Sequence, residues 1–162
     1  MTWQKPTNIF PDRICAALAY VLPLAGSVMF APFVLRDMPV LSWLLLPTVP
    51  LLQIYNSLPF AQLIVFILLL VGVVRNASIS HFIRFNVMQA ILLDIVLFLA
   101  SLLMSYIFDP IVSGTIVQEI LYSTVFLGIL AAVIYGVIES FMGIYPDKIP
   151  GVSQATHYQV PF

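Results

Sequence analysis

Charged residues are scarce in this chain, and the few that occur are scattered. Of its 162 residues, six are Lys or Arg and seven are Asp or Glu, which gives 8% charged residues and a formal net charge of −1. Soluble domains carry about 25% charged residues, and nucleic-acid-binding surfaces need clustered basic side chains. The scarcity of charge therefore argues against a soluble domain and against a nucleic-acid partner.

Cysteine and histidine are also rare. The single cysteine, Cys15, excludes an intrachain disulfide, and its apolar surroundings predict a small buried hydrophobic residue rather than a redox or metal site. The two histidines, His81 and His157, are expected in a loop and in the C-terminal tail, without the spacing of a metal site. A Gly-rich phosphate loop and a Gly-x-Ser-x-Gly motif are absent as well. We therefore expect no enzyme, no metal and no other cofactor.

Apolar residues make up 62% of the chain. A soluble core of this size cannot bury so many apolar side chains, whereas lipid makes their exposure favourable. Four stretches approach the roughly 20 apolar residues that a bilayer crossing needs. The sequence predicts a single all-α membrane domain over residues 1–162, with tails at 1–13 and 145–162 and with spans at about Ile14–Leu35, Leu58–Val74, Phe85–Ile107 and Ile120–Met142.

Prolines interrupt this pattern in three places. Pro23 predicts a kink in the first span, because proline lacks the backbone donor and clashes with the preceding turn. The apolar stretch Val40–Ile54 is short and contains Pro47 and Pro50, so we expect an interfacial or re-entrant segment between the first two spans. The Pro-containing tail from Tyr145 onward is expected to be an irregular surface segment.

The basic residues indicate an orientation. With four spans, one side of the membrane receives Lys5, Arg13, Arg75, Arg84 and Lys148, and the other side receives Arg36. The positive-inside rule then places both chain ends on the cytoplasmic side. A fifth span at Val40–Ile54 would weaken this bias, so the charges favour four spans.

A strip of polar residues follows the start of the third span. It consists of Arg84, Asn86, Gln89 and Asp94. Arg84 is expected at the membrane interface, where it can reach water or lipid phosphate. A carboxylate at the bilayer centre costs about 2.5–3.5 kcal/mol on translocon scales, so Asp94 is expected to be protonated, paired or in contact with water. Two interpretations remain open for the strip: it lines an aqueous or proton-linked path, or it hydrogen-bonds neighbouring helices.

Small residues recur at every fourth position of the fourth span. They are Thr124, Gly128, Ala132, Gly136 and Ser140. Such spacing lets two helix backbones approach closely within a membrane. The stripe is expected to serve either packing within the bundle or contact with another copy or another subunit.

Three segments of the chain carry a wider resemblance. They are His81–Asp94 with its core Arg-Phe-Asn-x-x-Gln-Ala, Ile14–Leu24 with its Ala-Tyr-Val-Leu-Pro-Leu, and the closing segment Pro146–Gly151. Together they resemble the twenty-kilodalton subunit family of the chloroplast inner-envelope protein translocon and its cyanobacterial relatives. The resemblance implies a helical bundle that acts as a channel or scaffold in preprotein translocation, with both ends on the stromal or cytoplasmic side. The partners expected on this basis are the lipid bilayer, other membrane subunits or further copies of the chain, and preproteins in transit.

The first span follows a short polar stretch without a plastid transit peptide. The sequence therefore resembles a cyanobacterial or plastid-encoded member, in a plasma, thylakoid or inner-envelope membrane. The leading hypothesis is a channel-forming or core translocon subunit, and the alternative is a non-conducting scaffold or assembly subunit. A proton-coupled or small-solute carrier that uses Asp94 is a third hypothesis, which the lack of internal repeats disfavours.

Overall fold

Three helices are long and apolar enough to cross a bilayer, and a bent helix pair that passes the same test brings the crossings to four if it forms one broken span. The computed structural model describes residues 10–160, and no β-strand occurs among them. The predicted all-α polytopic fold is therefore confirmed. Lys5 and the outer parts of the two predicted tails, residues 1–9 and 161–162, lie outside the described residues. The crossings are Phe10–Phe30, Pro39–Ser57 with Ala61–Val74, His81–Val112 and Ile116–Met142.

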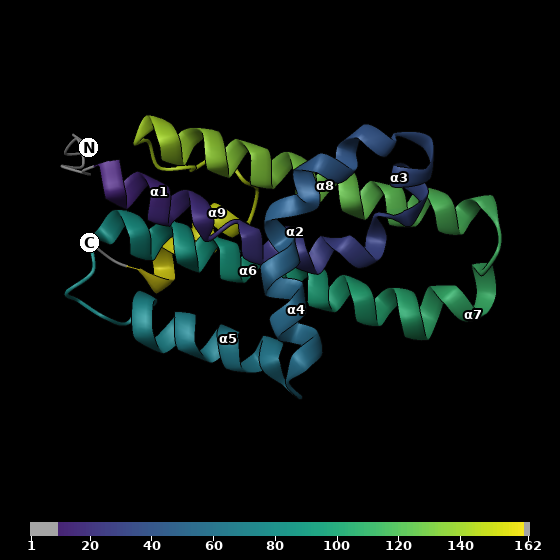
Figure 1. Ribbon diagram of the computed structural model, residues 1–162, viewed down its shortest axis with the longest axis horizontal. Helices are drawn as coiled ribbons and strands as arrows, with labels where there is room; N and C mark the ends of the chain where they lie inside the picture. The colour runs from purple at the N-terminus through teal and green to yellow at the C-terminus, as the bar shows by residue number, and fades with distance from the viewer. Residues whose placement is uncertain (1–9, 161–162) are drawn as a thin grey trace.

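The crossings are built from shorter helical elements, which lie side by side as a bundle in Figure 1. The α-helices are α1 (Phe10–Leu18), α2 (Val21–Ser27), α3 (Pro32–Asp37), α4 (Val49–Ser57), α5 (Ala61–Leu69), α6 (His81–Leu103), α7 (Asp109–Val112), α8 (Ile116–Met142) and α9 (Val152–Gln159). Short 3₁₀ and π helices connect some of them: η1 (Val28–Phe30), η2 (Pro39–Thr48), η3 (Leu70–Val74) and η4 (Met104–Phe108).

The first crossing is kinked as Pro23 predicts. A proline ring clashes with the carbonyl four residues earlier, which here belongs to Ala19. The helix is interrupted at that residue, between α1 and α2, and the Ala19 carbonyl instead accepts a hydrogen bond from the Leu22 amide at 3.2 Å. The crossing begins at Phe10 and ends at Phe30, earlier than predicted at both ends.

The second crossing is broken at mid-height of the bundle. Helix α4 runs across the long helices, about midway between the two ends of the bundle (Figure 1), and α5 leaves it at an angle of 118°. The turn places Phe60 in the left-handed region, with φ of 58°. Helices α5 and η3 have nine and five residues, so they rise only about 21 Å. The predicted span Leu58–Val74 therefore shares the second crossing with the Pro-containing segment before it.

Local sequence signals fix the ends of the two longest helices. Helix α6 begins at His81, because the Ser80 hydroxyl caps it by accepting the Ile83 amide at 3.5 Å. The predicted loop position of His81 is therefore wrong. Helix α8 ends at Met142, because Gly143 follows it with a φ of 75° that suits a glycine, and the Ile144 amide then donates to the Glu139 carbonyl at 2.9 Å.

The prediction of an irregular C-terminal segment is also wrong. Residues Val152–Gln159 form α9, which packs against α6 and buries Ser153, Thr156 and Val160. These positions follow helical spacing, but two of them are polar, so their hydropathy does not indicate an amphipathic helix. Their hydroxyls are satisfied locally, since Thr156 Oγ1 donates to the Val152 carbonyl at 2.8 Å.

The even number of crossings brings the described ends of the chain together. The start of α1, the connection from α5 to α6, and α9 lie at one end of the bundle, while α3 and α7 lie at the other (Figure 1). At that other end, the Arg36 guanidinium donates to both carboxylate oxygens of Glu119, at 3.2 and 3.1 Å. This bidentate pair joins α3 to the start of α8.

Candidate functional site

The first half of α6 lies at the centre of the bundle. Nearly every residue from Phe82 to Ile91 is buried, because α1, α2, α8, α9 and η3 surround this half of the helix. Beyond Asp94, most residues of α6 are exposed. Polar groups in the first half must therefore find partners within the protein, since neither water nor lipid reaches them.

Asn86 joins three parts of the bundle. Its side chain is 0% exposed. Its Nδ2 donates to the Phe82 carbonyl at 2.9 Å, and its Oδ1 accepts from the Tyr20 hydroxyl at 3.1 Å and from Ser140 Oγ at 2.9 Å. The amide thus links α6 to the first crossing and to α8.

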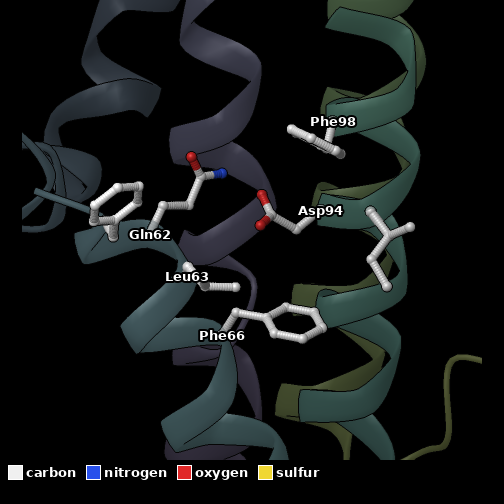
Figure 2. A pocket seen from close by; sticks show the side chains of 7 residues that line it. Gln62, Leu63, Phe66, Asp94 and Phe98 are labelled. Atoms are coloured by element: carbon white, nitrogen blue, oxygen red, sulfur yellow. The ribbon is translucent and has the colours of Figure 1, made fainter. Parts of the chain in front are cut away.

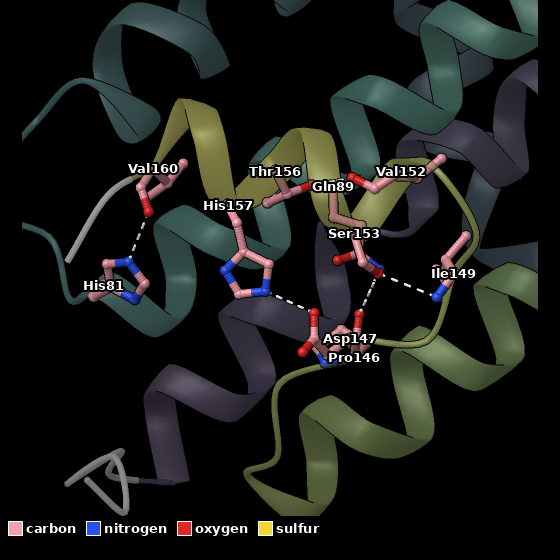
Figure 3. Close-up of polar contacts among 10 residues, drawn as sticks. All are labelled: His81, Gln89, Pro146, Asp147, Ile149, Val152, Ser153, Thr156, His157 and Val160. Carbon is pink, nitrogen blue, oxygen red and sulfur yellow. Dashed lines mark hydrogen bonds and ion pairs between the residues drawn. The ribbon is translucent and has the colours of Figure 1, made fainter. Parts of the chain in front are cut away.

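Gln89 holds the segment that follows α8. Its Nε2 donates to the Pro146 carbonyl at 2.9 Å, and the same carbonyl accepts from Ser153 Oγ at 3.0 Å. Ser153 Oγ in turn accepts from the Ile149 amide at 3.1 Å (Figure 3), which ties the turn before α9 to its first residues. The oxygen of the same amide, Gln89 Oε1, is buried without a hydrogen-bond partner among the described residues.

His81 fastens the far end of the same segment. Its Nε2 lies 3.0 Å from the Val160 carbonyl (Figure 3) and its Nδ1 lies 3.0 Å from the Tyr145 hydroxyl. A carbonyl can only accept, so Nε2 carries the proton and Nδ1 accepts from Tyr145. The Tyr145 ring also packs edge-on against Phe82 and Phe85, and burial raises the pKa of its hydroxyl.

Two further polar contacts belong to this end of the bundle. Arg84 Nε donates to the Val74 carbonyl at 2.8 Å, which satisfies the end of η3. His157 Nε2 lies 2.6 Å from Asp147 Oδ1 (Figure 3) and pairs α9 with the segment before it. Arg84, Asn86 and Gln89 are thus engaged with three separate parts of the protein.

Asp94 is placed differently, at the edge of a cavity between α5 and α6. The cavity has a volume of about 520 Å³. Its lining residues are Phe60, Gln62, Leu63, Phe66, Asp94, Ile95 and Phe98. Gln62 faces Asp94 from α5, and Figure 2 shows its amide turned toward the carboxylate. Asp94 itself is 6% exposed.

Gly26 leaves the room that the Asp94 carboxylate occupies. A Cβ added at Gly26 would lie 2.7 Å from Asp94 Oδ1 and 3.2 Å from a methyl carbon of Leu97. The carboxylate therefore lies against the backbone of α2 on one side and faces Gln62 on the other.

The structure divides the small-residue stripe of α8 between two surroundings. Gly136 and Ser140 are buried against the first crossing and α6. Thr124 and Gly128 are exposed, with nothing within 4 Å of a Cβ built at Gly128, and Ala132 is half-buried. A four-residue step advances about 40° around an α-helix, so the stripe turns from the bundle interior to its outside.

Three features of the site escape the sequence-based predictions. Tyr20 was not identified as the partner of Asn86, and α9 was not expected as a cover over Gln89. Gln62 was not identified as the residue that faces Asp94. The sequence does contain a signal for it, because Gln62 is a single amide in an apolar run, just as Asp94 is a single carboxyl in another. The prediction that Cys15 is buried is wrong: its side chain is exposed and lines an apolar groove of about 660 Å³ beside α4 and α5.

Comparison with known proteins identifies similar chains. The family model described as "Chloroplast import apparatus Tic20-like" matches residues 3–156. A Tic20 family protein from Synechocystis sp. is 48% identical over 151 residues, which cover 93% of this chain and 94% of that protein. From Arabidopsis thaliana, protein TIC 20-II, chloroplastic, is 34% identical over 92% of this chain and 72% of its own length. Protein TIC 20-v, chloroplastic, is 36% identical over 92% and 71%.

Proposed function

This chain belongs to the Tic20-like family of the chloroplast import apparatus, and on that basis we propose that it is a non-enzymatic core subunit of a protein translocon. Its place is a cyanobacterial plasma or thylakoid membrane or a plastid inner envelope. In this role it assembles with other membrane subunits, and the path for a preprotein runs between this bundle and its neighbours.

The burial of the α6 amides is the observation that supports a path between subunits. Asn86 and Gln89 are 0% exposed, and both bond groups of the same chain. A polypeptide crossing inside the bundle would have to displace these contacts together with α9. Outer surfaces of the bundle require no such rearrangement.

We also propose that both ends of the chain face the cytoplasm or stroma. Among the described basic residues, Arg13 belongs to the start of α1, Arg75 to the connection from η3 to α6, Arg84 to the first turn of α6 after it, and Lys148 to the segment before α9, whereas Arg36 belongs to α3. The start of α1, this connection and α9 lie at one end of the bundle, and α3 lies at the other (Figure 1). This distribution follows the positive-inside rule.

Purification from native membranes tests the proposed role. An affinity-tagged chain, extracted in mild detergent, is expected to bring down other integral membrane subunits together with an arrested preprotein. A matched purification from cells that express an unrelated four-span protein with the same tag gives the background. Recovery of the chain alone, without partners, would contradict the proposed role.

Thiol labelling tests where the path lies and how the chain is oriented. In a Cys15→Ser background, Asn86→Cys and Gln89→Cys are expected to stay protected from an impermeant maleimide. Exposed controls at the two ends, Ser113→Cys and Gln154→Cys, are expected to react from opposite sides of the membrane, with Gln154→Cys reacting from the cytoplasmic side. Reaction of both controls from the same side would overturn the orientation.

A pore within the bundle is the second candidate function. It is favoured by the unpartnered Oε1 of Gln89, which would meet water if α9 left the bundle. This candidate predicts that Gln89→Cys reacts with the maleimide only while a preprotein is in transit. Protection of Gln89→Cys in both states would exclude it.

A further inference from the structure

Asp94 has no basic partner within the described chain. The ion pairs that occur there involve Arg36 and His157, and none includes Asp94. The nearest basic residue along α6 is Arg84, ten positions earlier, which is about 15 Å along the helix axis. Gln62 faces the carboxylate with an uncharged amide. The carboxylate is thus held deep in an apolar bundle with an amide as its partner.

The cavity beside Asp94 opens toward the side of the bundle. Its polar lining residues are Asp94 and Gln62, and the others are apolar. Helix α5 begins at Ala61, level with the cavity, so the second half of α6 has no neighbour on that side (Figures 1 and 2). Phe98, which lines the cavity, is 56% exposed, and Leu99 after it is 54% exposed. An apolar helix face therefore continues directly from the cavity.

The chemistry of the cavity selects among possible occupants. A lipid phosphate carries the same sign of charge as the carboxylate and lies at the membrane surface, and an acyl chain leaves Asp94 without a cation. The described Lys and Arg residues of a second copy lie outside the middle turns of its long helices: in α1, near the end of α3, after η3, in the first turn of α6 and between α8 and α9. The occupant must supply a positive charge for the carboxylate and an apolar surface for the exposed face of α6. A partner helix with one basic side chain supplies both.

We propose that the cavity formed by Asp94, Gln62 and the apolar side chains around them docks a transmembrane helix of another subunit, which carries a Lys or Arg in its central turns. The basic side chain enters between α5 and α6 and pairs with Asp94, while Gln62 holds the carboxylate toward it. This inference rests on the proposed role as a core subunit. It adds the chemistry by which one partner subunit is recognised.

A synthetic helix tests the site directly. The purified full chain, with a donor dye on Ser113→Cys in the Cys15→Ser background, is reconstituted in phosphatidylcholine vesicles. The probe is an acceptor-labelled Leu-rich transmembrane peptide with one central Lys, and the matched control peptide has Leu at that position. Energy transfer is expected to show at least about tenfold tighter association of the Lys peptide, which corresponds to about 1.4 kcal/mol.

Two protein variants make the test specific to the carboxylate. Asp94→Asn keeps the size of the side chain and is expected to abolish the preference for the Lys peptide. Glu139→Gln removes a carboxylate outside the cavity and is expected to preserve it. Equal association of the two peptides with the unaltered chain, including no association of either, would overturn the proposal, as would an unchanged preference in Asp94→Asn. Recovery of native subunits with the tagged chain is measured separately, so failure here leaves the proposed role standing.

Discussion

The ring of Tyr20 packs directly against the backbone of Gly136. A Cβ built at Gly136 would lie 2.8 Å from the Tyr20 hydroxyl oxygen and closer still to the ring carbons. This approach lets the first crossing meet α8 closely enough for the Tyr20 hydroxyl to reach Asn86. The glycine in α8 thus determines whether the polar centre of the bundle can form.

Substitution of Gly136 is expected to destabilise the bundle. Gly136→Ala pushes the added carbon into the Tyr20 ring, which is 0% exposed, and overpacking of this kind costs about 1–3 kcal/mol. The control is Gly128→Ala, where nothing lies within 4 Å of the added carbon. Thermal unfolding in detergent should show a loss for Gly136→Ala and none for Gly128→Ala. Equal effects of the two would contradict the observed division of the stripe.

The outward half of the stripe can be tested separately. Gly128→Leu adds bulk on an exposed face of α8, so the folded monomer should be as stable as the unaltered chain. If this face contacts another subunit, the variant should lose that subunit during purification from native membranes. Ile134→Leu, at another exposed position of α8, serves as the control for a surface change without added bulk.

The bond between Asn86 and Tyr20 is expected to show energetic coupling. Asn86→Leu and Tyr20→Phe each remove one partner of the 3.1 Å bond, and hydrogen bonds between membrane helices contribute about 0.6–2 kcal/mol. In a double-mutant cycle of unfolding free energies, the double variant should lose less than the sum of the two single variants. Strict additivity would show that the bond contributes nothing to stability.

Gln89 is expected to control how firmly α9 is held. Gln89→Leu removes the donor to the Pro146 carbonyl, so the amide hydrogens of residues 152–159 should exchange faster with solvent. Gln154→Leu, on the exposed side of the same helix, is the control and should leave the exchange unchanged. Slow exchange of α9 in Gln89→Leu would show that other contacts suffice to hold it.

Alkaline pH is expected to loosen the same segment through Tyr145. Burial raises the pKa of its hydroxyl above the ordinary value of about 10. A group with a raised pKa in the folded state contributes stability below its unfolded pKa and loses it as pH rises through the folded pKa. A polarity-sensitive dye on Gln154→Cys should therefore report release of α9 above pH of about 10. In Tyr145→Phe this transition should disappear. Helix α9 is then held less firmly against α6 at every pH, because the bond from Tyr145 to His81 is lost.

The long helices could be predicted from the sequence because each is a sustained apolar run, and Pro23 marked the kink because its effect is local. The path of the second crossing could not be predicted in the same way. Hydropathy gives the length of Val40–Ile54 but not the 118° bend that follows it, which depends on the turn at Phe60 and on packing against α2 and α5.

The polar strip shows the same limit at the level of the site. Composition and depth were enough to select Asn86, Gln89 and Asp94. Their partners come from distant parts of the chain, namely Tyr20, the Pro146 carbonyl and Gln62, so helix periodicity alone could not assign them. Helix α9 was missed because its buried face carries hydroxyl groups, which a hydropathy pattern scores as surface.

The shortness of α5 has a consequence for the surrounding lipid. A helix that rises about 21 Å cannot fill a hydrocarbon layer of about 30 Å, so acyl chains beside α5 and the open half of α6 must shorten or tilt to follow the protein. Mismatch of this kind costs a fraction of a kcal/mol per Å. A partner helix seated on this flank fills the same space with protein, so the lipid there no longer needs to deform.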